Sequence, residues 1–103
     1  MPKRYRLYEE SLQEALRDPR EAAEYLNACL ADGSRDVFLL ALRQVAEAHG
    51  IARVATAAKR GRETLYRTLS SGGNPTLETL LRLFDATGLK LSVEPKKRSR
   101  KAA

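Results

Sequence analysis

The 103 residues are enough for one small domain, and 43% hydrophobic with 31% charged residues is typical of a soluble chain that buries a core. The longest apolar run, residues 37–42, is much shorter than the roughly 18 residues of a membrane-spanning helix, and no signal peptide is recognisable near Met1. One Cys and one His exclude an internal disulfide and a structural zinc site, so we expect a cytoplasmic protein without membrane, metal or cofactor.

The net charge of +6 is unevenly distributed along the chain. Residues 1–50 carry seven basic and nine acidic side chains, whereas residues 51–103 carry twelve basic and four acidic ones. An acidic first half joined to a basic second half predicts two surfaces for two different partners.

Two helices are predicted in the first half of the chain. Asp18 and Pro19 are typical of a helix start, and apolar residues follow at helical spacing until Gly33 ends the pattern. Ser34 is the expected cap of a second helix, which runs to residues 49–50.

Three more helices are predicted in the second half. Two of them are short, over residues 51–58 and 62–69, and the loop at 70–75 separates them from a last helix. We expect Thr76 to cap that last helix and Gly88 to close it.

The two ends of the chain give weaker signals. Residues 5–12 are apolar enough to pack onto the body, in either an extended or a helical form. Residues 89–93 alternate apolar and polar side chains and form either a short strand or an extended cover. Residues 94–103 are expected to be a disordered basic tail. The pattern predicts an all-α bundle of about five helices, with a possible short C-terminal strand.

The two short helices have the features of a helix-turn-helix. Ala55 is the small residue that a close helix crossing needs, Leu65 and Leu69 point inward, and the outer face is polar and cationic. Residues 51–75 carry five basic side chains and one acidic one. The second helix of such a motif enters the major groove of DNA, where Arg is the commonest reader of guanine.

The same region resembles a known family. ATAA at 55–58, GRETLYRTLS at 61–70 and GNPTLETL at 73–80 are similar to the Cro/repressor-type helix-turn-helix antidote proteins of addiction modules, the HigA-like antitoxins. AAEYLN at 22–27 resembles the segment that precedes the motif in that family, and the likeness covers roughly residues 15–93. The resemblance implies a type II antitoxin that neutralises a RelE/ParE-superfamily (HigB-like) toxin and represses transcription of its own operon.

The turn of the motif departs from the family pattern. Lys59, Arg60 and Gly61 stand where the family has Gly, an aliphatic residue and Ser. We expect Lys59 to adopt the left-handed conformation at a cost of ~1 kcal/mol, and the turn to be looser or differently shaped.

The candidate DNA contacts lie on and around the second short helix. They are Arg53, Lys59, Arg60, Gly61, Arg62, Glu63, Thr64, Tyr66, Arg67, Ser71 and Asn74. For Arg62 and Arg67 the alternative is a merely solvated face. Glu63 either accepts from a cytosine amine or pairs with Arg67, while Tyr66 either touches a phosphate or is partly buried.

The chain divides into three parts. Residues 1–33 are an N-terminal helical extension, residues 34–93 the helix-turn-helix domain on the same core, and residues 94–103 the tail. Because RelE/ParE-like toxins are basic, the acidic extension is the candidate toxin contact. Its residues are Glu14, Glu21, Glu24 and Tyr25. The alternative is that the helix over residues 19–31 completes the core or forms a dimer contact.

Three functions remain open at this point. No pattern of catalytic residues is present, so we expect a protein that is not an enzyme. The alternatives to an antitoxin are the toxin itself, whose fold would contain a sheet, and a stand-alone phage-type repressor. Reading a double-stranded DNA operator with palindromic half-sites requires a homodimer, for which the last helix and residues 89–93 are the candidate surfaces.

Overall fold

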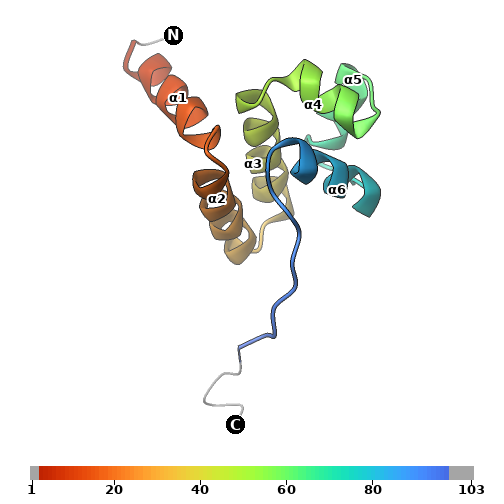
Figure 1. Ribbon diagram of the computed structural model, residues 1–103. Helices are drawn as coiled ribbons and strands as arrows, with labels where there is room; N and C mark the ends of the chain where they lie inside the picture. Colours follow the sequence, from red (N-terminus) through yellow and green to blue (C-terminus); the bar gives the residue numbers. More distant parts are fainter. Residues whose placement is uncertain (1–2, 98–103) are drawn as a thin grey trace.

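The structure, a computed structural model, describes residues 3–97 and is helical over most of that range (Figure 1). Its helices are α1 (Lys3–Leu16), α2 (Pro19–Asp32), α3 (Arg35–Ala48), α4 (Ile51–Ala58), α5 (Arg62–Thr68) and α6 (Leu77–Ala86). No helix within these described residues is long and apolar enough to cross a membrane.

Local capping residues set the helix boundaries as predicted. The side chains of Asp18, Ser34 and Thr76 each accept a hydrogen bond from a backbone N–H in the first turn of the helix that they precede. Gly33 ends α2 in the left-handed conformation, with φ +81°. These contacts satisfy backbone groups that a helix end leaves unpaired, so the start and stop of each helix follow from short stretches of sequence.

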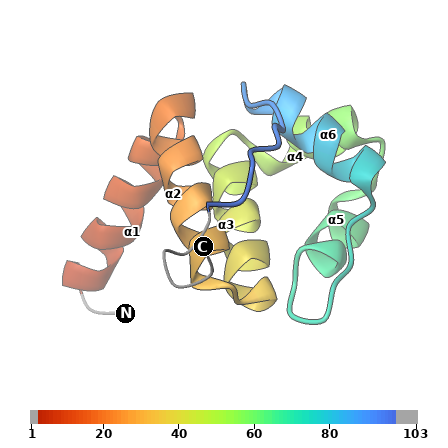
Figure 2. The same cartoon turned by 90° about the horizontal axis from the view of Figure 1, so that it is seen from below.

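The third helix occupies the centre of the molecule. It packs against α1 and α2 on one side and leads into α4, α5 and α6 on the other (Figures 1 and 2). One apolar core joins the two sides, and its larger members are Leu16, Leu26, Leu39, Leu42, Val45, Val54, Leu65, Leu69, Leu83 and Phe84. Burying a leucine contributes about 1.5–3 kcal/mol, so α1 and α2 stabilise the same domain as α4 to α6.

The structure differs from the predicted fold in two details. Residues 3–97 contain six helices rather than about five, because residues 3–16 form a helix, whereas the sequence left the conformation of this segment undecided. The possible strand over residues 89–93 is wrong, since no strand is present among residues 3–97. A strand requires a neighbouring strand for its hydrogen bonds, and the described chain offers none. Residues 94–97 also lack regular structure, and the rest of the predicted tail lies outside the described residues.

Candidate nucleic-acid interface

A tight turn connects α4 to α5. Lys59 lies in the left-handed region, with φ 57° and ψ 43°, as predicted from its place in the motif. Its backbone N–H donates to the carbonyl of Thr56 at 3.1 Å, and that of Arg60 donates to the carbonyl of Ala55 at 3.0 Å. This pair of bonds is a Schellman motif, which normally has glycine at the left-handed position. The turn therefore keeps a compact shape although neither Lys59 nor Arg60 matches the family pattern.

The inner side of α4 and α5 is apolar and completely packed. Ala55, Leu65 and Leu69 are at most 3% exposed, which confirms the inward direction predicted for the two leucines. Arg60 is exposed instead of entering the core. The small Ala55 side chain allows α5 to cross close to α4, so α5 has a defined position on the domain.

The outer side of α5 and its turn is polar and cationic. Most of the predicted DNA contacts are exposed here: Lys59, Arg60, Gly61, Arg62, Glu63, Thr64 and Arg67. The ion pair found among residues 3–97 joins Glu78 to Arg82, so Glu63 and Arg67 do not form the predicted alternative pair. Arg62 and Arg67 are exposed on α5, and no acidic side chain of the described part of the chain lies within 4 Å of either as an ion-pair partner.

Tyr66 differs from its neighbours because it is partly buried. Its hydroxyl donates to Oε2 of Glu47 on α3 at 3.2 Å. Burial, followed by the negative charge of Glu47, raises the pKa of Tyr66 above its ordinary value of 10.0. Of the two alternatives predicted for Tyr66, partial burial is confirmed. Its hydrogen-bond acceptor is Glu47, which the sequence did not indicate.

Arg53 at the start of α4 connects two other helix ends. Its Nη2 donates to the carbonyl of Ala86 at 2.9 Å and its Nε to the carbonyl of His49 at 3.3 Å. Since the carbonyls at helix C-termini carry partial negative charge, the guanidinium stabilises both ends. Arg53 is exposed but already contributes to the fold, in addition to any contact with DNA.

The loop after α5 is held by the beginning of α3. Ser71 Oγ donates to Asp36 Oδ2 at 3.0 Å, and the Gly72 N–H donates to Asp36 Oδ1 at 3.4 Å. Arg35 Nη2 donates to the carbonyl of Gly73 at 2.9 Å, while Asn74 is exposed. Sequence reasoning missed Arg35 and Asp36 because they precede the loop by 35 to 38 positions, and no local pattern marks such a contact.

The predicted toxin contacts lie on α1 and α2, across α3 from α5 (Figure 1). Glu14, Glu21 and Glu24 are all exposed. Tyr25 is partly buried, and its hydroxyl donates to Oε1 of Gln44 on α3 at 2.5 Å. The three carboxylates are accessible to a partner protein, whereas the Tyr25 hydroxyl already donates a hydrogen bond to Gln44 within the fold.

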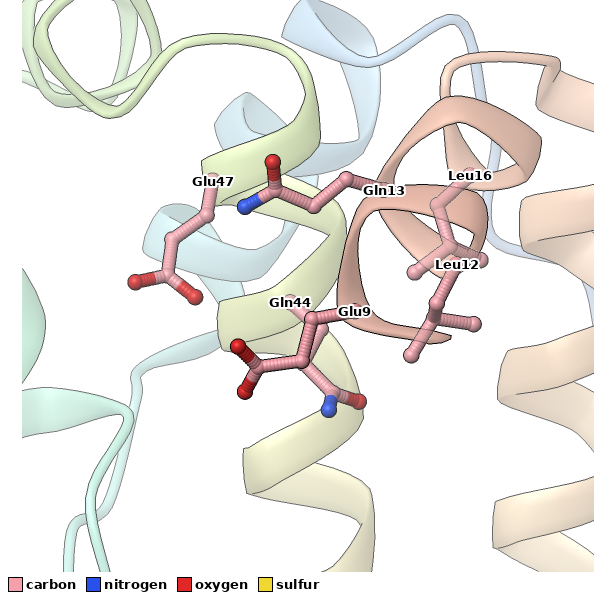
Figure 3. A pocket seen from close by; sticks show the side chains of 6 residues that line it. All are labelled: Glu9, Leu12, Gln13, Leu16, Gln44 and Glu47. Carbon is pink, nitrogen blue, oxygen red and sulfur yellow. The ribbon is translucent and has the colours of Figure 1, made fainter. Parts of the chain in front are cut away.

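A hollow of about 230 Å³ lies between α1 and α3. Figure 3 shows Gln13 reaching from α1 toward Glu47 on α3, with Glu9 and Gln44 below them. Among the described residues no group of three or more potential metal ligands is present. Both polar and apolar side chains line the hollow, with Leu12 and Leu16 beside the two glutamates and the two glutamines.

Comparison with known proteins identifies the family. Residues 7–95 match the family model described as "probable addiction module antidote protein". A protein of Haemophilus influenzae, described as uncharacterized, is 35% identical over 81 residues, which cover 79% of this chain and 84% of that protein. No solved structure matches the chain. Because the family match spans both the acidic helices and the α4–α5 region, the chain belongs to the addiction module antidote proteins, the antitoxins.

Proposed function

We propose that this protein is the antitoxin of a type II module with two binding activities and no catalytic one. It neutralises a basic toxin of the RelE/ParE superfamily, in the manner of HigA-like antitoxins, and it represses its own operon by binding DNA. The observation that carries the proposal is the family membership of residues 7–95, together with the exposed cationic face of α5 in that same segment.

The geometry of α4 and α5 supports DNA binding of the Cro/repressor type. The Schellman turn and the buried Ala55 and Leu65 hold α5 firmly, while Arg62 and Arg67 project outward. A firmly held helix places an Arg side chain against guanine, whereas Lys59 and Arg60 neutralise phosphates. Tyr66 is not assigned to base reading, because Glu47 already accepts from its hydroxyl.

A homodimer is part of the proposal. Leu77 and Leu81 lie one turn apart on α6 and are 61% and 46% exposed. Beside them, α2, α3, α6 and residues 89–92 surround a largely apolar groove of about 500 Å³. A second copy of the chain is the occupant that fits, because two recognition helices are needed for a palindromic operator.

The acidic side of α1 and α2 is the proposed toxin contact. Glu14, Glu21 and Glu24 are exposed and lie on the opposite side of α3 from α5. Carboxylates there attract a toxin whose surface is basic because it grips RNA. The separation of the two surfaces allows one molecule to hold the toxin and the operator together.

Two experiments test the proposal. The first is a gel shift with the DNA upstream of the gene, in which the wild type should retard the operator as a dimer and Arg62→Ala should bind more weakly. A wild type that prefers this DNA no more than a scrambled duplex contradicts the repressor activity.

The second experiment is the rescue of cells that express the neighbouring toxin. The variant Glu21→Gln with Glu24→Gln should rescue less well than its matched control, Asp85→Asn with Glu94→Gln, which removes two exposed acids elsewhere. Equal rescue by the two pairs places the toxin contact away from α2, and no rescue by the wild type contradicts the antitoxin activity.

A further inference from the structure

Two neighbouring residues at the start of α3 hold the loop that follows α5. Both carboxylate oxygens of Asp36 accept hydrogen bonds, from the Ser71 hydroxyl and from the Gly72 N–H. Arg35 donates to the next carbonyl along, that of Gly73. Three bonds from α3 thus reach three consecutive residues of the loop, and we call this arrangement the loop clamp.

Within the loop itself the Gly73 N–H donates to the carbonyl of Ser70 at 2.8 Å, which closes one turn, and the bonds from α3 join this turn to the rest of the domain. Gly72 has φ +82°, and a Cβ on Gly73 would lie 2.0 Å from the carbonyl oxygen of Thr68, in the last turn of α5. The loop backbone is therefore pressed directly against the end of α5. A glycine-rich segment loses much conformational entropy when it is fixed, so the bonds from Arg35 and Asp36 add to the single internal turn in holding the loop in one shape.

We propose that Asp36 and Arg35 are positioning residues for the binding of DNA. They fix residues 71–73, and hence the exposed Asn74 and the end of α5 that carries Arg67, in the arrangement that meets the phosphate backbone. The inference rests on the proposed DNA-binding function and adds residues on α3 to it, outside α4, α5 and their loop.

The direction in which operator affinity changes when Asp36 is removed distinguishes positioning from charge repulsion. An acidic side chain near DNA repels phosphates, so its removal from a mere surface position should strengthen binding. If Asp36 positions the loop, Asp36→Ala should instead weaken operator binding, by about tenfold, which corresponds to about 1.4 kcal/mol. Charge alone and positioning therefore predict opposite changes in the dissociation constant.

The test measures operator affinity for Asp36→Ala, Asp36→Asn and Ser71→Ala, each first checked for helicity by circular dichroism. Asp36→Asn removes the charge but keeps an acceptor oxygen, so it should retain more operator affinity than Asp36→Ala. Ser71→Ala removes one exposed hydroxyl and should weaken binding only where Asp36 is present. The double variant Asp36→Ala with Ser71→Ala should accordingly bind the operator no more weakly than Asp36→Ala alone.

A second readout is independent of DNA. Amide hydrogen exchange at Gly72 and Gly73 in the free protein should be faster in Asp36→Ala than in the wild type. Operator binding by Asp36→Ala that equals or exceeds the wild type overturns the positioning role. A wild type with protected loop amides that fails to select operator DNA overturns the proposed repressor function, and with it the reason for the clamp.

Discussion

Replacing Lys59 with glycine should make the protein more stable. Lys59 is the one non-glycine residue among the described residues with a positive φ, and a left-handed residue with a Cβ costs roughly 1–2 kcal/mol. Glycine has more conformational freedom than lysine in the unfolded chain, and this offsets about half of the relieved strain. The free energy of unfolding should therefore increase by about 0.5–1 kcal/mol. At roughly 4–8 °C per kcal/mol for a domain of this size, the melting temperature should rise by about 2–8 °C.

The matched control is Arg60→Gly, at the next position of the same turn. Arg60 is also exposed and cationic but has no positive φ, so glycine there should lower the stability by about 0.4–1 kcal/mol. Thermal unfolding followed by circular dichroism measures both variants. Both should lose similar DNA affinity, because each removes one cation. A melting temperature that falls equally in the two variants would refute the argument that Lys59 is strained.

Three further predictions concern single side chains. Arg62→Ala should cost roughly 1–3 kcal/mol of operator binding and relax the preference at one base pair, as measured by gel shift over operator variants. Tyr66→Phe should lose about 0.5–1.5 kcal/mol of stability in denaturant titrations. Because burial and Glu47 raise the pKa of Tyr66, the protonated hydroxyl should stabilise the protein fully below pH 10. This contribution should decline as the pH rises through the folded-state pKa of Tyr66. The variant Tyr66→Phe should lack this part of the loss of stability at alkaline pH. Burial and then the Asp32 charge raise the pKa of Cys29 above 9.0, so alkylation at pH 8 should be slower in the folded protein than in urea.

Local chemistry explains which parts of the fold could be predicted. Asp18, Ser34 and Thr76 cap helices through hydrogen bonds that reach only two or three residues along the chain. The left-handed Lys59 is likewise a property of the four or five residues around it. Such features depend on neighbours in sequence, which is why the boundaries of α2 to α6 agree closely with the predicted ones.

Contacts between distant segments explain what could not be predicted. The partners of Tyr66 and Ser71 are Glu47 and Asp36, and each pair is separated by 19 or 35 positions. Both acids appeared only as part of the negative charge of the first half. The alternation over residues 89–93 was misleading for a similar reason, because a strand depends on a neighbour that only the complete fold can supply.

The two proposed activities depend on one hydrophobic core, which α1 and α2 share with α5. Leu16 and Leu26 are at most 5% exposed and belong to the same cluster as Leu65 under α5. A protease that removed the first two helices would expose the apolar side of α3 that they cover, which belongs to the same core cluster, and we expect the remaining helices to lose stability. We therefore expect cleavage within α1 or α2 to weaken both proposed activities together, the binding of the toxin and that of the operator.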